Sequence, residues 1–341
     1  MTSRQLRMLY VGLGVTASCL LILSTSSRPH LQTKLEEDIA FNVPSLSNAL
    51  DEQQIGPDGK AVDLHPIQEL PNPERLAFNK TVQSYNECII EKYNAIKQNQ
   101  TTVWERGLQD IVEDCKQKTD IKKIIISPLK NNDEIKHHVF SQYEEPSTIV
   151  TLGVGADTAV EEYLKSKLPS GSQFMAADPV YEPNAKMFEK IGLFFPFAVG
   201  AETGVSIANI RNNQGNYEKQ LMTHIDLEIF FGKLVNKTKI DHLLLDNEGP
   251  EYDLMPRLGR NDLFDEMGVT VCQMNVEVHS GRTGFTKDEL RSEFIRIIDR
   301  ILYEQRYVIL FSSYYGHQRM FLMNVESNYC VNKYMIQFFS N

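Results

Sequence analysis

The chain after Pro146 alternates short apolar runs with amphipathic stretches. Apolar runs of about four to eight residues between turn residues predict buried strands, and apolar positions three or four residues apart predict helices. Strands are predicted at residues 148–152, 173–177, 194–199, 242–245, 271–278, 307–312 and 320–325. Helices are predicted at residues 158–168, 184–190, 226–235, 250–258 and 287–305.

Strands that alternate with helices indicate βαβ units, and therefore a mostly parallel sheet with helices on both faces. The run HLLL at residues 242–245 lacks polar alternation, which fits a strand buried on both faces. The last two strands are joined by SYYGHQ, which is too short for a crossover helix and predicts an antiparallel hairpin. The sequence therefore predicts an α/β domain over residues 147–341, with a seven-stranded sheet finished by that hairpin.

Residues 8–23 carry no charge, follow Arg4 and Arg7, and precede small residues up to position 27. This pattern is typical of a secretory-pathway leader over residues 1–27. A cleaved signal peptide and an uncleaved signal anchor both remain open, because the apolar run is shorter than the about 20 residues of a full span. The two arginines and the lack of a clear A-x-A site favour the anchor. The rest of the chain is then expected in the lumen, as part of a single-pass type II membrane protein, or secreted.

Residues 28–78 are polar and contain several prolines and the run GPDG, which predicts a stem or linker. From residue 79, apolar positions such as Val82, Tyr85 and Ile89 recur at helical spacing. We therefore expect a helical N-terminal extension over residues 79–146, packed on the domain that follows.

Four cysteines follow the leader, and an even number permits two disulfides in an oxidising compartment. Cys88 and Cys115 flank one helical segment and are the predicted pair. Cys272 lies in an apolar strand, so a buried free thiol and a bridge to Cys330 both remain open. Sequons that are compatible with a lumenal domain occur at Asn79, Asn99 and Asn236.

The chain has 341 residues, of which 42% are hydrophobic, so it can bury the core of a large domain. Its formal charge is -10, from 45 acidic and 35 basic residues. Binding along a nucleic-acid backbone needs a basic face, so this balance argues against nucleic acid as a partner.

In an open α/β sheet, ligands bind beyond the carboxyl ends of the strands. The first strand ends in TLGVGADT, where Gly153 and Gly155 let the backbone turn tightly near a ligand. An ordinary turn in which Asp157 caps the next helix is the alternative. The second strand ends in MAADP, where Asp178 can accept both ribose hydroxyls of an adenosine or act as a cap.

The stretch LLLDNEGPEYDLM places Asp246 directly after a buried strand and Pro250 in the first turn of a helix. Glu248 and Glu251 partly serve the positive end of that helix. Asp246 must face a cleft, because a carboxylate at the end of a central strand otherwise bears a desolvation cost.

The fifth strand, VCQMNVEVHS, places Asn275, Glu277 and His279 on one alternating face. His279 is a candidate general base or substrate contact, and a hydrogen-bonded loop histidine is the alternative. Neighbouring Asp246, Asn247 and Glu248 offer hard oxygen ligands, but without a distant partner they do not predict a metal site.

These motifs resemble the FkbM-type family of S-adenosylmethionine-dependent methyltransferases, in the divergent form found in large nematode families. The run IDHLLLDNEGPEYDLM is similar to the family block I-D-x-x-K-I-D-x-E-G-x-E-x-x-x-L. AVGAETGVSIANI, from Ala198, resembles the family's third-strand turn and hairpin, and NVEVH resembles its E-x-H ending. The similarity covers about residues 147–325.

The resemblance implies a class I, Rossmann-like methyltransferase fold with S-adenosylmethionine as cofactor. It implies signature residues at Asp246, Glu248, Gly249 and Glu251. We further expect cofactor contacts at Gly153, Gly155, Asp157, Asp178, Ala198 and Val199, a substrate or signature role for Glu277, and catalytic roles for Asp246 and His279. The family's first motif, D-x-G-A-N-x-G, reads T-L-G-V-G-A-D here, with Thr151 in place of the opening acid. That acid helps to hold the methionine amino group, so another acid, such as Asp157 or Asp246, would have to substitute for it.

Three functions follow as hypotheses. The first is O-methylation of a lumenal or secreted acceptor, such as a glycan or a small metabolite. The second is a methyltransferase fold without catalysis that serves as a binding protein, which Thr151 favours. The third is a type II glycosyltransferase, which fits the leader and stem, although the interior lacks a D-x-D sequence.

Overall fold

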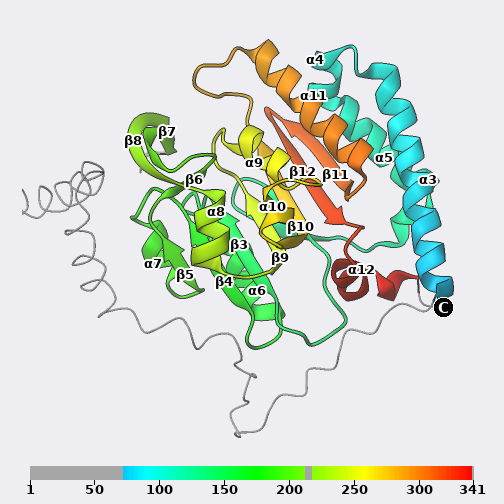
Figure 1. Cartoon of the computed structure of the whole chain (residues 1–341), viewed down its shortest axis with the longest axis horizontal. Helices are drawn as coiled ribbons and strands as arrows, with labels where there is room; N and C mark the ends of the chain where they lie inside the picture. Colours follow the sequence, from blue (N-terminus) through cyan, green and yellow to red (C-terminus); the bar gives the residue numbers. More distant parts are fainter. Residues whose placement is uncertain (1–71, 212–216, 340–341) are drawn as a thin grey trace, which may run out of the picture. The chain divides into compact units, whose positions relative to one another are not determined.

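The computed structural model of the chain describes residues 72–211 and 217–339 (Figure 1). The predicted leader, and the predicted stem up to residue 71, lie outside the described residues. Within the described ranges, no helix combines the length and the apolar character that crossing a membrane requires.

A seven-stranded sheet forms the centre of the domain, in the order β11-β12-β10-β9-β3-β4-β5 (Figure 1). The strands from β10 to β5 are parallel, whereas β12 is antiparallel to both β10 and β11. The predicted parallel sheet with an antiparallel hairpin is therefore present, although two short helices follow the hairpin. The strands are β3 (Thr148–Leu152), β4 (Gln173–Ala177), β5 (Leu193–Phe195), β9 (Lys239–Leu245), β10 (Thr270–Val278), β11 (Tyr307–Tyr315) and β12 (His317–Asn324).

The strand predicted at residues 194–199 is wrong as a single element. Pro196 has no N–H to donate, and it separates β5 from β6 (Ala198–Gly200). β6 joins a three-stranded sheet with β7 (Gly204–Arg211) and β8 (Tyr217–Asp226). The chain thus leaves the central sheet at Pro196 and builds a separate hairpin.

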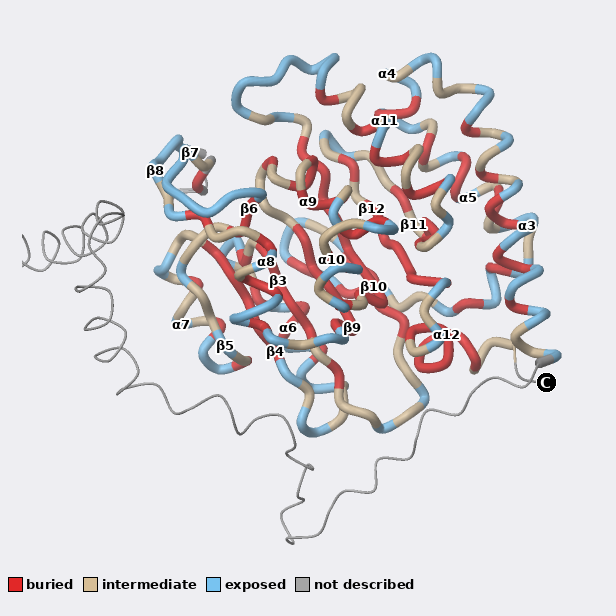
Figure 2. The backbone as a smooth tube through the Cα atoms, viewed as in Figure 1, coloured by how far each residue is buried: buried red, intermediate tan, exposed pale blue. Residues whose placement is uncertain are grey.

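Helices cover both faces of the sheet (Figure 2). Neighbouring residues of a strand point to opposite faces, and Leu243 and Leu244 accordingly belong to two different hydrophobic clusters. Leu244 packs in the cluster of α6, and Leu243 in that of η4 and α9. These helices and their neighbours are α6 (Ala159–Lys167), α7 (Asn184–Phe188), α8 (Leu227–Ile229), η4 (Phe230–Val235), α9 (Glu251–Arg257), α10 (Leu263–Glu266), α11 (Lys287–Glu304), α12 (Asn328–Tyr334) and η5 (Ile336–Phe338).

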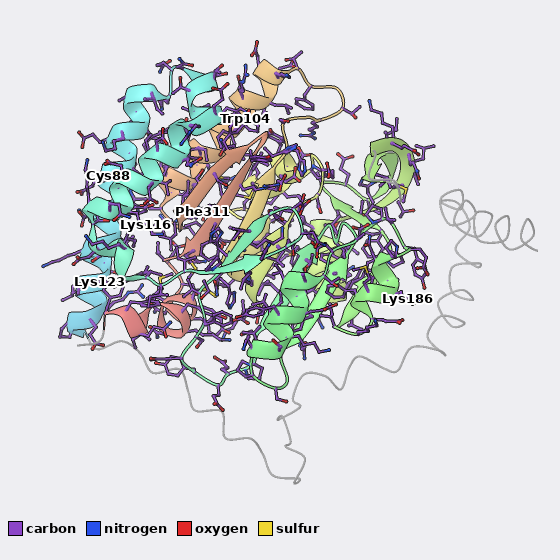
Figure 3. All side chains as sticks on the ribbon, turned by 180° about the vertical axis from the view of Figure 1, so that it is seen from behind. Cys88, Trp104, Lys116, Lys123, Lys186 and Phe311 are labelled. Carbon is purple, nitrogen blue, oxygen red and sulfur yellow. A yellow bond between two sulfur atoms is a disulfide. The ribbon has the colours of Figure 1, made fainter. Side chains whose placement is uncertain are left out.

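The N-terminal extension starts with α3 (Asn72–Ile96), which begins within the segment predicted as a stem. A disulfide between Cys88 and Cys115 joins α3 to α5 (Leu108–Lys118), and α5 packs on β11 (Figure 3). Between these helices lie α4 (Gln100–Thr102) and η2 (Val103–Gly107), and η3 (Asp120–Lys123) follows α5. The extension also contains a two-stranded sheet of β1 (Ser127–Lys130) and β2 (Ile135–His138), which the sequence did not predict.

Two side-chain amides of β10 hold the backbone at β2 against the sheet. Gln273 accepts a hydrogen bond from Val139 N at 2.8 Å and donates one to Val139 O at 3.0 Å. Asn275 likewise accepts a hydrogen bond from His137 N at 2.8 Å and donates one to His137 O at 2.7 Å. Each amide thus pairs with the backbone as a neighbouring strand would, so the chain at β2 is fixed without being part of the large sheet.

Asn275 also sets the protonation of a buried histidine pair. Its Nδ2 donates to His242 Nε2 at 2.6 Å, so the hydrogen of neutral His242 is on Nδ1. His242 Nδ1 lies 2.9 Å from His138 Nδ1, which must accept. Burial lowers the pKa of both imidazoles, that of His138 to about 3, with Lys333 and the neighbouring imidazole adding to the effect.

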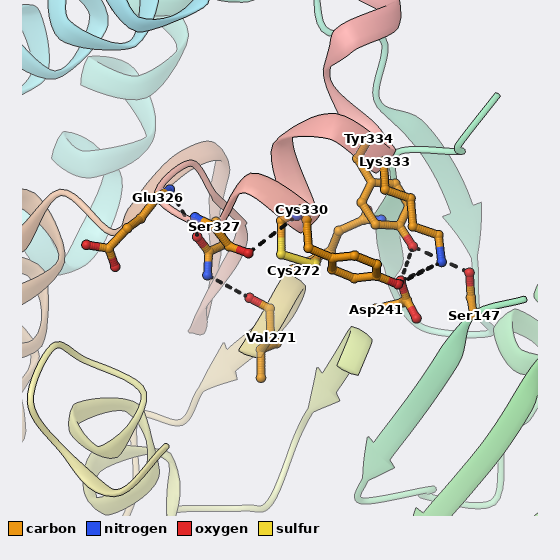
Figure 4. Close-up of a disulfide and its surroundings, with 12 residues drawn as sticks. Ser147, Asp241, Val271, Cys272, Glu326, Ser327, Cys330, Lys333 and Tyr334 are labelled. Atoms are coloured by element: carbon orange, nitrogen blue, oxygen red, sulfur yellow. Dashed lines mark hydrogen bonds and ion pairs between the residues drawn. A yellow bond between two sulfur atoms is a disulfide. The ribbon is translucent and has the colours of Figure 1, made fainter. Parts of the chain in front are cut away.

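The C-terminal helix α12 is fixed by a second disulfide and a buried ion pair (Figure 4). Cys272 forms a disulfide with Cys330. Of the free thiol and the bridge that the sequence left open, the structure therefore has the bridge. Lys333 Nζ lies 2.8 Å from Asp241 Oδ1, which also accepts hydrogen bonds from Tyr329 and Tyr334. Asp241 Oδ2 accepts from Thr148 N, so one carboxylate joins α12, β9 and β3.

The histidine pair predicts a loss of stability in acid. The folded pKa values lie below the unfolded value of about 6.5, so the unfolded chain takes up protons that the folded chain excludes. The free energy of unfolding should be unaffected by these groups above about pH 6.5. It should fall as the pH drops below that value, with a slope of up to about 1.4 kcal/mol per pH unit for each group.

Denaturant unfolding between pH 8 and pH 4 measures this slope. In the His138→Asn variant, the amide oxygen replaces Nδ1 as acceptor and does not titrate, so the slope should be shallower than in the wild type. Equal slopes in the two proteins would refute the assignment.

The ion pair predicts a strong single-substitution effect. Lys333 and Asp241 are 0% and 3% exposed, so Lys333→Met leaves a buried carboxylate without its counter-charge and should cost about 3 kcal/mol or more. The double variant Lys333→Met, Asp241→Asn removes both charges and should recover part of that loss in urea unfolding. Additive losses in the double variant would show that the two side chains are not coupled.

Candidate active site

A cavity of about 1480 Å³ opens at the edge of the sheet where β3, β4, β9 and β10 end. The strands end together because Leu152 pairs with both Ala177 and Leu245. The turn between β1 and β2 and the β7–β8 hairpin also line the cavity. Its volume exceeds the about 300–1000 Å³ of a typical small-molecule pocket, so it has room for two ligands.

The loop after β3 is shaped by glycine. Gly153 has φ +85°, and a Cβ atom at this position would lie 1.9 Å from the carbonyl oxygen of Asp246. Gly155 has φ +62° and faces open space. The loops after β3 and β9 therefore lie so close together that a side chain at position 153 would push them apart.

Asp178 holds this loop in place. Its Oδ2 accepts hydrogen bonds from Val154 N at 2.7 Å and Gly155 N at 3.1 Å, and its Oδ1 accepts one from Val180 N at 2.7 Å. Burial raises the pKa of the Asp178 carboxyl, and these backbone hydrogen bonds oppose the rise. The sequence left open whether Asp178 accepts the hydroxyls of a ribose or serves the local backbone, and most of its acceptor capacity is used by the loop.

Asp157 also lines the cavity, but its carboxylate oxygens accept hydrogen bonds from backbone N–H groups. Oδ1 accepts from Ala159 N at the start of α6, and Oδ2 accepts from Asn132 N in the β1–β2 turn. Asp157 thus supports the start of α6 from the position before its N-cap, Thr158, which is close to the capping role that the sequence left open. It also ties the helix start to the extension.

Thr151 is paired with a carboxylate that the sequence analysis missed. Its hydroxyl donates to Glu161 Oε1 at 2.7 Å, and both residues are 2% exposed. Glu161 comes from α6 and lines the cavity. Burial raises the pKa of Glu161, while the hydrogen bond from Thr151 lowers it. A carboxylate from the helix thus lies beside the strand position where the family has an acid.

Glu251 orients His279. The fully buried Glu251 accepts hydrogen bonds from Asn247 N at 2.7 Å and Gly249 N at 2.8 Å, which shapes the loop after β9. Its Oε1 also lies 3.0 Å from His279 Nδ1. Because a carboxylate there accepts, Nδ1 carries a hydrogen and Nε2 is directed toward the cavity.

Carboxylates surround His279 Nε2. Asp246 Oδ1 lies at 3.5 Å, Glu248 Oε2 at 3.3 Å and Glu277 Oε1 at 4.0 Å. Burial lowers the pKa of His279, but the carboxylates, Glu251 first, more than offset it, and the pKa lies well above its usual value. Burial raises the pKa of Asp246 to about 7, against the opposing charges of Lys136 and His279.

Two cations that the sequence analysis did not predict border this group. Lys136 on β2 contacts Glu134 and lies 4.0 Å from Asp246 Oδ2. Arg319 on β12 lies 2.7 Å from Glu277 Oε2 and 3.4 Å from Glu134. The antiparallel direction of the last strand was a usable signal for Arg319, because it places the start of that strand at the ligand-binding edge.

Ala198 and Val199, which are expected cofactor contacts, line the cavity. The side chain of Asn247 turns away from the acids and donates to Val199 O at 2.9 Å. Ser206 and His224 of the β7–β8 hairpin also line the cavity, and the sequence analysis did not identify them. The sequon residues Asn79, Asn99 and Asn236 are exposed and do not line it.

The profile of the methyltransferase FkbM domain matches residues 104–309, more than half of the chain. The match begins upstream of the predicted domain start at residue 147 and includes β1 and β2. No curated protein matches the chain. The matched residues contain the glycine loop, Asp178, Glu161 and the acids around His279, so the chain belongs to the FkbM methyltransferase family.

Proposed function

We propose that the protein is an S-adenosylmethionine-dependent methyltransferase that methylates a hydroxyl group of a lumenal or secreted acceptor, such as a glycan or a small metabolite. One observation carries this proposal: the glycine loop after β3 and the acids around His279 border the same cavity. That cavity is large enough for a cofactor and an acceptor side by side.

The residues of the cavity fit the cofactor. S-adenosylmethionine supplies a methyl group on a cationic sulfonium. Gly155 leaves open space beside the loop, and Asp178 and Glu161 line the same cavity. Glu161 suits the role of holding the methionine amino group, because it lies at the position that Thr151 leaves without an acid.

The charge of the cavity restricts the acceptor. Acidic side chains outnumber basic ones on its walls, which favours cationic and neutral ligands over phosphorylated ones. The acids are Asp133, Glu134, Asp157, Glu161, Asp178, Glu202, Asp246, Glu248, Asp253 and Glu277, and the bases are Lys136, Arg282 and Arg319. An uncharged hydroxyl compound fits this balance.

Asp246 and His279 are the groups placed to manage the proton of an acceptor hydroxyl. The Asp246 side chain is 30% exposed at the cavity, whereas that of His279 is 5% exposed and held by Glu251. Asp246 is therefore the group that can reach a hydroxyl, and Glu251 is a positioning residue that acts through His279. Methyl transfer gains much of its rate from alignment, so one such proton acceptor suffices.

A secretory location agrees with the two disulfides and with the exposed sequons. The membrane tether belongs to this proposal through the predicted leader, which lies outside the described residues.

The alternatives lose support. A fold without catalysis was favoured by Thr151, but Glu161 brings a carboxylate to the same place. A type II glycosyltransferase does not agree with the FkbM family match.

Calorimetric titration of S-adenosylmethionine into the full-length protein tests the cofactor. Glu161→Gln removes a charge-assisted hydrogen bond worth about 1.5 to 3 kcal/mol, so the affinity should fall tenfold or more. Glu162→Gln is the matched control, because Glu162 is the exposed neighbour on the same helix, and it should bind like the wild type. Absence of binding by folded wild-type protein at millimolar cofactor would refute the proposal.

Asp246→Asn tests the chemistry. The amide cannot take the proton, so transfer of labelled methyl groups to glycan and metabolite extracts should fall about 100-fold or more. Cofactor affinity should change little, because the tie between the loops after β3 and β9 is made by the backbone. Unchanged methyl transfer in this variant would exclude Asp246 as the proton acceptor.

A further inference from the structure

We propose that Asp246, Glu248 and His279 bind a first-row divalent cation, with Mn²⁺ or Zn²⁺ the best match. One imidazole nitrogen and two carboxylates are a donor set that these ions accept, whereas Mg²⁺ and Ca²⁺ prefer oxygen alone. We refer to these three side chains as the strand-end site.

The spacing of the donor atoms fits a common ion. His279 Nε2 lies 3.5 Å from Asp246 Oδ1 and 3.3 Å from Glu248 Oε2, and one atom from each residue lies within 4.8 Å of the others. Two ligands bound at about 2.1 Å to one cation are about 3.0 Å apart at a right angle and about 3.4 Å apart at the tetrahedral angle. The nitrogen of His279 is therefore already separated from each carboxylate oxygen by about the distance of neighbouring ligands.

The orientation of His279 is a second, independent observation. His279 is 4% exposed, and its Nδ1 lies 3.0 Å from Oε1 of the fully buried Glu251. A buried carboxylate on the far nitrogen is the usual support of a metal-bound histidine. Carboxylate oxygens of three residues lie 3.3–4.0 Å from Nε2, so the local charge favours a cation at this position.

The fixed charges near the site leave room for a divalent cation. Several carboxylates converge there, and two basic side chains offset only part of their charge. The carboxylates are those of Glu134, Asp246, Glu248, Glu251 and Glu277, and the basic side chains are Lys136 and Arg319. Lys136 faces Oδ2 of Asp246, whereas the site uses Oδ1, so the lysine does not occupy the proposed position.

Neighbouring groups are less suitable ligands. Glu277 is paired with Arg319 at 2.7 Å. His317 Nδ1 accepts a hydrogen bond from Ser280 N at 3.1 Å, so in the neutral ring the other nitrogen carries the hydrogen and cannot bind a metal. Three protein ligands remain, and the other coordination positions face the cavity.

This arrangement suggests a role in acceptor binding, which rests on the proposed function. An oxygen of the acceptor can take an open position on the cation, which places its hydroxyl beside Asp246 and makes it more acidic. Asp246 would bind the cation through Oδ1 and keep Oδ2 for the proton.

Electron paramagnetic resonance of Mn²⁺ added to chelator-treated, full-length protein tests the site. We expect saturable loss of the free-ion signal at one ion per chain, reversal by Zn²⁺, and a nitrogen coupling in the spin-echo spectrum of the wild type. His279→Gln should weaken binding tenfold or more and remove the nitrogen coupling. Glu228→Gln, an exposed acid outside the cavity, should bind like the wild type.

Two results would overturn the inference. One is a folded wild type that shows no saturable binding of Mn²⁺ or Zn²⁺ at millimolar concentration. The other is binding without nitrogen coupling, which places the ion elsewhere even where the His279 variant fails to fold. Cofactor titration with and without chelator separates the proposals, because S-adenosylmethionine binding without a metal site would contradict only this inference. Metal binding without cofactor binding would contradict only the proposed function.

Discussion

The polar side chains of β10 impose the constraint on which the rest of the site depends. Gln273, Asn275, Glu277 and His279 follow one another on one face of a buried central strand, and each needs a partner. A buried polar group without one costs about 1–3 kcal/mol. The partners come from three separate segments: the backbone at His137 and Val139, Arg319 on β12, and Glu251 after β9. The hydrogen bonds and ion pairs that β10 needs therefore fix β2, the β11–β12 hairpin and the loop after β9 together.

The same constraint explains the charge at the strand ends. Pairing of β2 with the amides of Gln273 and Asn275 brings Lys136 toward Asp246, and pairing of Glu277 brings Arg319 to the same place. These cations do not reach His279 Nε2, whose neighbours are carboxylates. A proton or a metal ion can supply the missing positive charge, and the two compete for the same nitrogen. Protonation of His279 therefore opposes metal binding at the strand-end site.

The sequence predicts those parts of the site that depend on local patterns. Apolar runs gave β3 and β4 with their observed bounds and placed Gly153, Asp178, Asp246 and His279 at one edge, because strand ends are visible in the sequence. Lys136 and Glu161 were not predicted, since their positions depend on which distant segments pack together. Neither were the hydrogen bonds that Asp178 accepts from backbone N–H groups, because hydrogen bonds to a folded loop leave no periodic signal.

Glu161 bears on whether the cavity still binds a ligand. A carboxylate that is 2% exposed carries a desolvation cost, and burial raises its pKa accordingly. The hydrogen bond from the Thr151 hydroxyl offsets part of that cost. A leucine or methionine at position 161 of α6 would avoid the cost altogether. A ligand ammonium group beside Glu161 would recover the cost by charge pairing. A buried acid beside Thr151 is thus easier to understand in a protein whose cavity binds a ligand with an ammonium group than in one whose cavity binds none.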